Sequence, residues 1–374
     1  MLCHAMKQQI LILLTGFFML ISHLASGQDK PLRIGVAGLT HTHVHWIFES
    51  EKRGDIEIVG IAESNRELAE RYAKQHGFSM DKVYPSLEAL IKEAQPEAVT
   101  AFGTIYDHLG VVETCAPMGI HVMVEKPLAV SLDHALKMAA LARKHGIQLL
   151  TNYETTWYPT NHKAYELVRA NNAIGPIRKV VVRDGHRGPK KIGVNTEFLE
   201  WLTDPELNGA GALMDFGCYG ANLMTWLMEG KKPRSVTAIT GQFQPENNPK
   251  VEDEAIILLQ YEKAVAIIQA SWNWPIGRKD MEIYGLTGAI YADNRHDLRI
   301  RMAEGYDGFS EESLNLPERT APMDDPFSYL KAVLQKEVVP EPYDLSSLEN
   351  NMLVMEILDA ARRSAATGKT IILD

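Results

Sequence analysis

Hydrophobic and polar positions alternate with two different rhythms along this chain. From Pro31 to Asn152, short apolar runs are separated by segments with helical periodicity. The expected strands cover residues 32–38, 57–63, 98–103, 121–127 and 147–152, and the expected helices cover residues 44–52, 65–77, 86–94, 107–119 and 131–146. This alternation buries a parallel sheet between helices and predicts an α/β, doubly wound Rossmann domain for binding a dinucleotide over residues 28–151.

The rhythm changes after Asn152. A helix is expected over residues 162–172, a strand with a polar exit over 177–188 and one long helix over 211–228. Alternating segments that favour strands then cover residues 235–243, 254–261, 264–274, 279–287, 288–294 and 297–303, followed by a capped helix over 347–368 and a strand over 370–374. The pattern predicts an α+β domain over residues 152–374, with a large, mostly antiparallel sheet covered by helices on one face. Its open face favours a homodimer or homotetramer.

The first 27 residues follow neither rhythm. Lys7 precedes an apolar run over residues 10–24, and the small residues Ala25, Ser26 and Gly27 come next. This layout is typical of a secretory signal peptide. The apolar run is also shorter than the ~20 residues that a membrane span needs. We therefore predict a signal peptide over residues 1–27 and an exported, periplasmic mature protein with no membrane anchor.

Composition restricts the partners. The 374 residues are 45% hydrophobic, carry a net charge of −10 and contain no long run of Lys or Arg. Such a chain is poorly suited to nucleic acid or to an anionic membrane surface. Of the cysteines, Cys115 and Cys218 fall in segments expected to be buried helix, which favours free core thiols over a disulfide.

Two opposite charges mark the end of the fourth expected strand, where Glu125 and Lys126 precede Pro127. In an open α/β sheet, ligands bind beyond the carboxyl ends of the strands. Lys126 is placed there to donate a hydrogen bond or take a proton, and Glu125 is close enough to bias its pKa. Pro127 ends the strand and fixes the backbone after the lysine.

The first strand-to-helix turn is a degraded dinucleotide fingerprint. Gly38 fills the first glycine position, whereas Thr40 and His43 occupy the second and third. Thr40 and the amides at the helix start can still hold a pyrophosphate. Glu63, at the end of the second strand, is placed to bind the ribose hydroxyls of NAD, while Arg66 leaves NADP possible.

Three alternate histidines, His41, His43 and His45, follow the same strand. Alternate histidines ligate zinc in some enzymes, including metal-dependent barrels. A barrel needs about eight strand–helix repeats, and the series here stops after Asn152. We therefore predict no metal site and expect the histidines to cap the turn or, His41 and His43 in particular, to line the cofactor and substrate cleft.

The long helix carries the candidate substrate chemistry. Asp215, Tyr219 and Asn222 are spaced four and three residues apart, so they are expected to share one face. Asp215 can accept hydrogen bonds from sugar hydroxyls, and Tyr219 can exchange a proton through its phenol, more easily beside a lysine. Further candidates for sugar contacts are Trp157, His186 and Arg187.

With these residues identified, the chain resembles the family of glucose–fructose oxidoreductase and inositol 2-dehydrogenase, written Gfo/Idh/MocA. The motifs that carry the resemblance are RIGVAGL (33–39), GTIYDH (103–108), HVMVEKPLA (121–129), GAGALMDFGCYGANL (209–223) and AARRSAATGKTIIL (360–373). The resemblance implies that Lys126, Asp215 and Tyr219 act at the substrate carbon. It also places Thr104 and His108 with Glu125 and Lys126 among the residues around the cofactor.

The resemblance implies an exported oxidoreductase that moves hydride between NAD, or NADP, and a sugar, polyol or glycoside. Because free NAD is cytosolic, an exported member is expected to hold its cofactor tightly. Two alternatives stay open on the same scaffold. One is a glycosidase that uses bound NAD without net redox change, and the other is a sugar-binding relative that has lost the cofactor.

Overall fold

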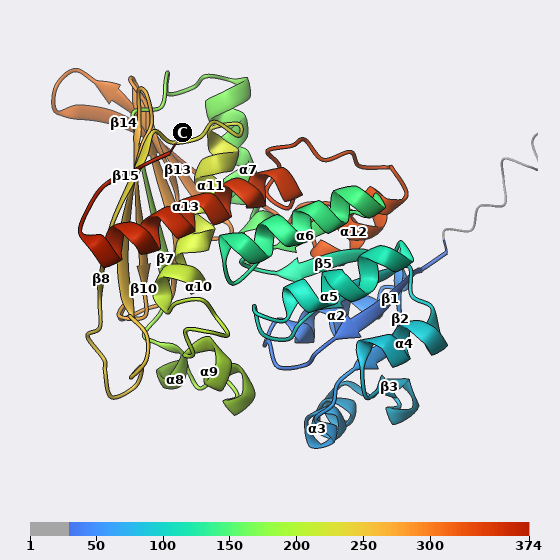
Figure 1. Ribbon diagram of the computed structural model, residues 1–374. Helices are drawn as coiled ribbons and strands as arrows, with labels where there is room; N and C mark the ends of the chain where they lie inside the picture. The colour runs from blue at the N-terminus through green and yellow to red at the C-terminus, as the bar shows by residue number, and fades with distance from the viewer. Residues whose placement is uncertain (1–29, 374) are drawn as a thin grey trace, which may run out of the picture.

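The computed structural model describes residues 30–373, so the predicted signal peptide lies outside the described residues. Within this range the chain forms two sheets that stand side by side, and α13 (Leu348–Thr367) reaches from the second sheet to the helices of the first (Figure 1). The division falls where the hydrophobic rhythm changes, because β6 (Leu149–Asn152) is the last strand of the first sheet.

The first sheet is parallel and has six strands in the described chain. Their order is β3 (Val83–Tyr84), β2 (Ile56–Ala62), β1 (Leu32–Ala37), β4 (Ala98–Ala101), β5 (His121–Glu125) and β6. The intervening helices are α2 (Val44–Glu51), α3 (Arg66–His76), α4 (Leu87–Ala94), α5 (His108–Cys115) and α6 (Leu132–His145). This is the strand order of a dinucleotide-binding Rossmann fold, and it confirms the predicted fold class.

Local sequence explains where these helices start and stop. The Ser131 side chain accepts the His134 amide at the start of α6, and Gly146 ends the helix in a left-handed conformation. Asn65 and Gly77 do the same for α3.

The second sheet has nine strands among the described residues. Their order is β14 (Gly308–Asn315), β13 (Asp297–Glu304), β12 (Gly288–Ala292), β11 (Arg278–Tyr284), β7 (Lys179–Gly185), β10 (Val265–Ser271), β9 (Glu254–Gln260), β8 (Ser235–Gly241) and β15 (Ile371–Ile372). Only β7 and β10 pair in parallel; the other neighbours are antiparallel. The predicted mostly antiparallel sheet is thereby confirmed.

The long helix expected over 211–228 is two helices. α10 (Ala212–Asp215) and α11 (Gly217–Leu227) meet at Phe216, and every residue of α11 is buried against the second sheet and α13 (Leu348–Thr367). Asp215 and Tyr219 both lie next to Lys126, whereas the Asn222 side chain contacts Leu345, so the predicted common face of the three residues is wrong.

Five strands and α-helices of the described chain were not expected from the sequence. They are β3, α8 (Pro189–Ile192), α9 (Thr196–Leu202), α12 (Pro326–Leu334) and β14. Although α12 lies late in the chain, its residues Phe327 and Leu330 pack into the core of the first sheet. α13 packs on α11, α6 and β8, and therefore ties the two halves together.

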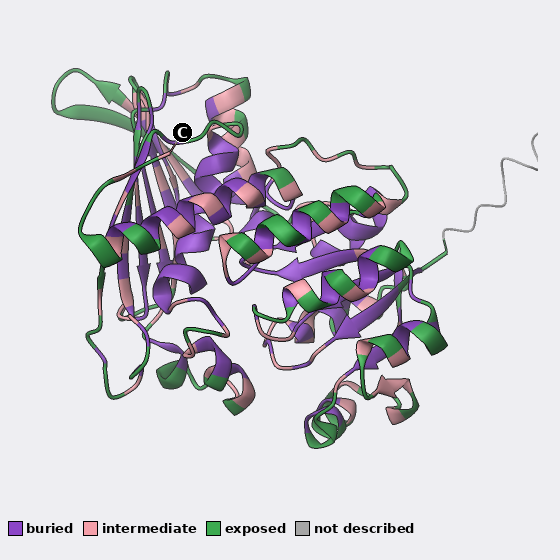
Figure 2. Cartoon of the chain, in the orientation of Figure 1, coloured by how far each residue is buried: buried purple, intermediate pink, exposed green. Residues whose placement is uncertain are grey.

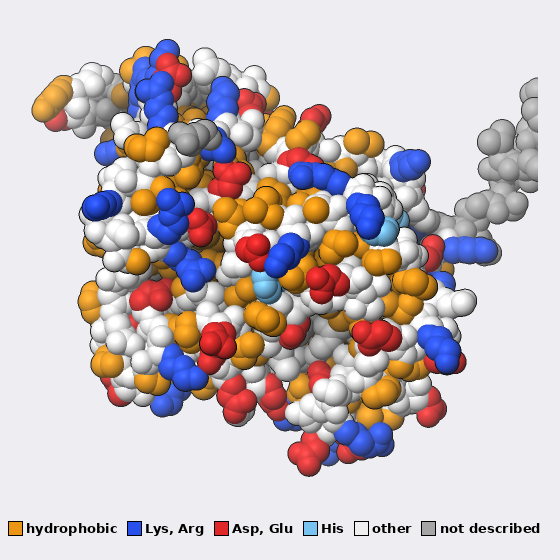
Figure 3. Space-filling view, in the orientation of Figure 1, with side chains coloured by type: hydrophobic (Ala, Val, Ile, Leu, Met, Phe, Trp, Pro, Cys, Tyr) orange, Lys and Arg blue, Asp and Glu red, His pale blue; other side chains and the backbone are white. Residues whose placement is uncertain are grey.

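Burial follows this plan (Figure 2). The strands of the first sheet are largely buried, those of the second alternate between buried and more exposed positions, and β14 is exposed along most of its length. α6 and α13 turn exposed residues outward along one side. Cys115 and Cys218 are free, buried thiols, as expected. No described helix is both long enough and apolar enough to cross a membrane. The face in Figure 3 carries acidic and basic side chains intermingled, with no large area of one sign.

Candidate active site

Lys126 forms a buried ion pair with Asp215. The lysine follows β5 directly, and its ammonium contacts the Asp215 carboxylate and donates to the Asp215 carbonyl oxygen at 2.9 Å. The two residues are 5% and 4% exposed, and Trp272 donates its indole N–H to the second carboxylate oxygen at 2.9 Å. Although burial opposes both charged forms, the pair raises the pKa of Lys126 and lowers the pKa of Asp215. Both groups are therefore charged at neutral pH.

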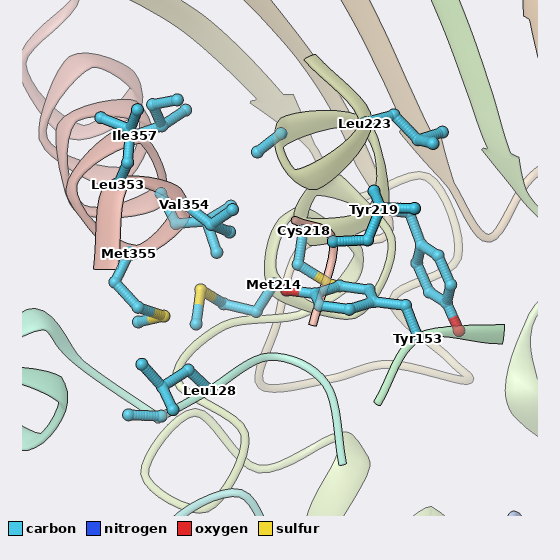
Figure 4. Packing of buried hydrophobic residues seen from close by; sticks show 14 of the residues in the cluster. Leu128, Tyr153, Met214, Cys218, Tyr219, Leu223, Leu353, Val354, Met355 and Ile357 are labelled. Atoms are coloured by element: carbon cyan, nitrogen blue, oxygen red, sulfur yellow. The ribbon is translucent and has the colours of Figure 1, made fainter. Parts of the chain in front are cut away.

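Tyr219 lies between two ammonium groups. The nitrogens of Lys126 and Lys279 are each 5.1 Å from the centre of its ring. Figure 4 shows the phenol turned away from Val354 and Ile357 of α13, whereas the hydroxyl of Tyr153 points back toward Met214 and Cys218. Burial raises the pKa of Tyr219 well above its usual value, so the phenol is neutral. A neutral phenol can donate its proton to a substrate oxygen and take it back in the reverse reaction.

Lys279 is a residue that the sequence analysis missed. It lies on β11, opposite Asp184 of β7, and its ammonium contacts the carboxylate of Glu154. Burial opposes ionisation of Glu154, but Lys279 outweighs it and lowers the Glu154 pKa to about 2. Tyr158 also donates its hydroxyl to Glu154. Glu154 could have been suspected from the sequence, because it follows the last strand of the first sheet by two residues. Lys279 could not, because only the pairing of strands brings it to this site.

Glu125 is held from two sides. Its carboxylate accepts from His43 Nδ1 at 2.9 Å and from the Asn152 side-chain amide at 2.7 Å. Burial raises the pKa of Glu125, but the charge and hydrogen bond of His43 outweigh it and lower this pKa to about 2. Trp157 donates its indole N–H to Asn152 at 2.9 Å and packs against Tyr329 in the core. The prediction that Trp157 stacks on a sugar is therefore wrong, because its ring is buried and supports Glu125 instead.

The other predicted histidines separate into different surroundings. His41 is buried, and its Nδ1 accepts the amide N–H of His43 at 3.1 Å. His108 is also buried, with Nδ1 3.1 Å from the Leu128 carbonyl oxygen, so it lies beneath the loop after Lys126. Burial lowers the pKa of His41 far below its usual value and that of His108 to about 4, so both are neutral. His45 turns away and contacts His76 at 2.7 Å.

A groove of about 350 Å³ runs along the carboxyl ends of the first sheet's inner strands. Its lining includes Gly38, Thr40, Glu63, Thr104 and Asp107. Gly38 has φ of +82°, and a Cβ there would lie 2.7 Å from the Gly103 amide nitrogen, so only glycine fits. The carboxylate of Glu63 accepts the Leu39 amide at 3.0 Å.

These features fit the adenosine half of a dinucleotide. The one glycine that the turn geometry requires is present, and an acidic residue ends β2 where ribose hydroxyls are bound in Rossmann folds. The residues that would hold the group are Gly38, Thr40, Glu63 and Thr104. When bound, a nicotinamide accepts or returns hydride.

The fingerprint turn is closed by α9 from the other half of the chain. Trp201 donates its indole N–H to the Thr40 hydroxyl at 3.1 Å, and the Phe198 ring lies 4.9 Å from the His41 ring. Glu197, on the same helix, forms an ion pair with Arg71 of α3 at 2.8 Å. The turn is therefore packed against protein at the positions where a typical fingerprint has its later glycines.

A cavity of about 660 Å³ is lined by Phe216 and Lys279, which lie next to the buried Lys126 and Tyr219. Its lining includes Glu154, Tyr158, His186, Phe216, Lys279 and Arg295. This volume lies within the range of ligand pockets. His186 stands edge-on to Phe216 at 5.0 Å, and burial lowers its pKa to about 4, so it presents a neutral ring to the cavity.

Two predicted substrate contacts are not at this cavity. Asn222 is fully buried in α11, and its amide donates to the Leu345 carbonyl oxygen at 2.8 Å. Its role is to join α11 to the segment before α13, so the prediction of a substrate contact is wrong. Arg187 is exposed and does not line the cavity, whereas its neighbour His186 does.

Together these residues can move a proton at a substrate oxygen. Tyr219 can offer a phenol to such an oxygen, and Lys126 a fixed positive charge that would favour a developing alkoxide. Asp215 holds Lys126 in place, and His186, Tyr158 and Phe216 line the adjoining cavity. This arrangement suits the interconversion of a hydroxyl and a carbonyl group beside a hydride acceptor.

Sequence comparisons agree with this geometry. Residues 32–153 match the model described as "Oxidoreductase family, NAD-binding Rossmann fold", and residues 162–291 match the "GFO/IDH/MocA C-terminal domain". The chain is 27% identical to trans-1,2-dihydrobenzene-1,2-diol dehydrogenase of Xenopus tropicalis, over 82% of this chain and 89% of that protein. It is 22% identical to D-glucoside 3-dehydrogenase of Escherichia coli (strain K12), over 92% of this chain and 98% of that protein.

Solved structures share the fold. An inositol dehydrogenase homolog from Azotobacter vinelandii, complexed with NAD+, superposes with a TM-score of 0.78 at 18% identity, covering 92% of this chain and 98% of that chain. An aldose–aldose oxidoreductase from Caulobacter crescentus, complexed with glycerol, gives 0.76 at 21% identity, covering 92% and 100%. The two matched domain models, the shared fold and the Lys126 site lead to one conclusion: this chain belongs to the Gfo/Idh/MocA family of NAD-binding oxidoreductases.

Proposed function

We propose that this protein oxidises a secondary hydroxyl of a neutral sugar or glycoside, or reduces the corresponding ketone, with NAD. The observation that carries the proposal is the buried Lys126–Asp215 pair beside the Tyr219 phenol, next to Phe216 and Lys279, which line a cavity of about 660 Å³. Several relatives are named for sugar or diol oxidoreduction, which supports this substrate class.

The charges of the cavity favour an uncharged substrate. Each basic residue of its lining is already paired with a carboxylate: Arg278 with Asp280 at 2.7 Å, Arg299 with Asp293 at 2.6 Å, Arg295 with Glu318 at 2.7 Å, and Lys279 with Glu154. A phosphate or carboxylate on the substrate would have to displace one of these partners. Hydroxyl groups, in contrast, can bind to the pairs as they stand.

A substrate panel tests both parts of the proposal. The purified protein is incubated with NAD+ and methyl glucoside, a disaccharide, a glucuronide or a sugar phosphate, and NADH formation is followed by absorbance. We expect turnover of the neutral glycosides at a kcat/KM at least about tenfold above that of the anionic ones, a difference of about 1.4 kcal/mol. Preference for the anionic substrates would contradict the neutral class, and no NADH with any of them would contradict the oxidoreductase.

The same panel separates the glycosidase alternative. A redox-neutral glycosidase would cleave the glycosidic bond with no accumulation of NADH, so product sugars are measured by chromatography alongside NADH. An oxidoreductase yields a keto-glycoside with the bond intact.

Tight retention of the cofactor is part of the proposal. α9 covers the fingerprint turn through Trp201 and Phe198, which favours slow release of a bound dinucleotide. Native mass spectrometry of the protein as purified reports NAD or NADP directly. We expect NAD, because Glu63 would repel the 2′-phosphate of NADP.

Export and assembly complete the proposal. We expect residues 1–27 to be removed on export to the periplasm, which N-terminal sequencing of the mature protein tests. We expect a homodimer or homotetramer through the open sheet face, where Ile239, Leu258 and Val265 are exposed. Light scattering measures the mass, and Leu258→Glu is expected to lower it to that of a monomer.

A further inference from the structure

Glu125 and His43 form a second hydrogen-bonded pair next to Lys126, and oxidation of a hydroxyl group does not use it. The bond between His43 Nδ1 and Glu125 Oε2 is 2.9 Å long. Glu125 is 1% exposed, and its other oxygen is held by Asn152, which is in turn fixed by Trp157. A carboxylate oriented by this many donors holds the imidazole in one position.

The hydrogen bonds determine where the protons are. Trp157 can only donate, so the Asn152 oxygen faces Trp157 and the Asn152 NH₂ group faces Glu125. Glu125 is ionised and can only accept, so His43 Nδ1 carries the hydrogen of this pair. In the neutral imidazole, Nε2 of His43 then keeps its lone pair and can act as a base.

This arrangement does not suit a metal ion, although His41, His43 and Glu125 place ligand atoms within 4.8 Å of one another. His43 Nδ1 and Glu125 are joined by a proton, and the Nδ1 lone pair of His41 is used by the His43 amide. His41 therefore carries its hydrogen on Nε2. A metal would have to displace both bonds, whereas a proton-transfer role keeps them.

His43 is also connected to Lys126 through the chain. It occupies the third position of the fingerprint turn, and its partner Glu125 immediately precedes Lys126. Within the described chain, Nε2 has no hydrogen-bond partner, and the side chain is 17% exposed. The ring is held in place by stacking on Trp46 at 3.9 Å, so the nitrogen is open while the ring is fixed.

We propose that His43, positioned by Glu125, removes and returns the proton on the carbon next to the one that is oxidised. A ketone makes this neighbouring C–H acidic. His43 Nε2 takes the proton, the C–H electron pair forms the double bond of an enolate, and the carbonyl oxygen takes the negative charge beside Lys126 and Tyr219. Return of a proton from His43 restores the ketone, with or without inversion at that carbon. The step consumes no oxidant, so it is a further activity that rests on the substrate class proposed above but not on hydride transfer.

Deuterium exchange tests this step without the cofactor. The probes are the methyl glucosides oxidised to a ketone at C2, C3 or C4, each incubated with the full mature chain in D₂O and followed by proton NMR. We expect loss of the signal next to the carbonyl on one of the probes, faster than in buffer alone. His43→Asn is expected to slow this exchange about 100-fold or more, the usual size of a general-base contribution.

A matched variant controls for changes to the turn itself. His45→Asn alters a histidine two residues away that pairs with His76 instead of Glu125, and it is expected to keep exchange within about twofold of the wild type. Circular dichroism melts show whether each variant is folded. Glu125→Gln, which keeps the shape and removes the charge, is expected to lie between the wild type and His43→Asn.

The outcomes are distinct from those of the proposed function. Reduction of the same probes by NADH reports hydride transfer separately. Reduction without exchange on any probe overturns the His43 proposal and leaves the oxidoreductase intact, whereas exchange without reduction does the reverse. Equal exchange by wild type and a folded His43→Asn also overturns it, as does exchange that a chelator abolishes, which would indicate a metal.

Discussion

Two lysine–carboxylate pairs flank the same phenol, and they differ in how the chain produces them. Lys126 follows a strand of the first sheet and is buried with Asp215, whereas Lys279 lies on a strand of the second sheet and pairs with the partly exposed Glu154. The first pair is marked by motifs on both partners. The second pair carries no such motif and exists only because β11 pairs with β7. Part of this site therefore depends on strand pairing that the local sequence does not reveal.

The two pairs should therefore respond differently to removal of the lysine, and the largest effect is expected at the buried one. Lys126→Met leaves the Asp215 carboxylate buried without a cation, which costs about 3–5 kcal/mol of unfolding free energy. Loss of the charge at the reacting oxygen is expected to lower kcat about 10³-fold. Denaturant unfolding and steady-state kinetics measure both. Lys126→Met with wild-type turnover would contradict the role of the pair, and Lys126→Arg serves as the charge-conserving control.

Acid should weaken the Glu125 cluster next. The pKa of Glu125 is about 2 in the folded protein, below its ordinary 4.5, so its contribution is complete above pH 4.5 and is lost as pH falls toward 2. A shift of this size corresponds to about 3 kcal/mol. Unfolding free energy measured by denaturant across this range is expected to fall more steeply for the wild type than for Glu125→Gln. If the unfolding free energies of the wild type and Glu125→Gln fell in parallel with pH, the stabilising role of ionised Glu125 would be contradicted.

Removal of the second lysine should matter less. Lys279→Met is expected to cost about 1 kcal/mol of stability, because its pair with Glu154 is partly solvated. We expect a fall of about tenfold in kcat/KM, since one of the two cations beside Tyr219 remains. A loss as large as that of Lys126→Met would show that the two pairs are equivalent and would break the comparison.

The narrowest change, confined to the KM for the cofactor, is expected in the nucleotide groove. Glu63→Gln removes the negative charge at the end of β2 and is expected to raise the KM for added NAD+ about tenfold, or about 1.4 kcal/mol, in protein stripped of its cofactor. The KM for NADP+ should fall over the same series, because its 2′-phosphate is no longer repelled. Unchanged values for both would place the ribose elsewhere.

The same contrast explains how much the sequence could predict. The order of the first sheet follows from apolar runs and caps such as Ser131 and Gly146, because local periodicity and βαβ handedness leave few alternatives. Lys126, Asp215 and Tyr219 were identified because their motifs have recognisable spacing. The predictions of the fold, the family and the free cysteines are confirmed.

Other features depend on contacts far apart in sequence. Asn222 is buried in α11, where the Leu345 carbonyl oxygen accepts its amide hydrogen from 123 residues away in sequence. Trp157 was predicted to stack on a sugar, but its indole N–H donates a hydrogen bond to the Asn152 side chain. α9 and α12 begin with recognisable caps, at Asn195 and at Asp325 followed by a proline, yet their docking on the first half has no local signal.

The central claim is that Lys126 and Tyr219 act on one substrate oxygen, and a double-mutant cycle tests it most directly. The kcat/KM for a neutral glycoside is measured for the wild type, Lys126→Met, Tyr219→Phe and the double variant. Groups that act as a unit give non-additive losses, so we expect the double variant to lose little more than the worse single variant. Losses that multiply would mean that the two side chains work independently, and would contradict the account.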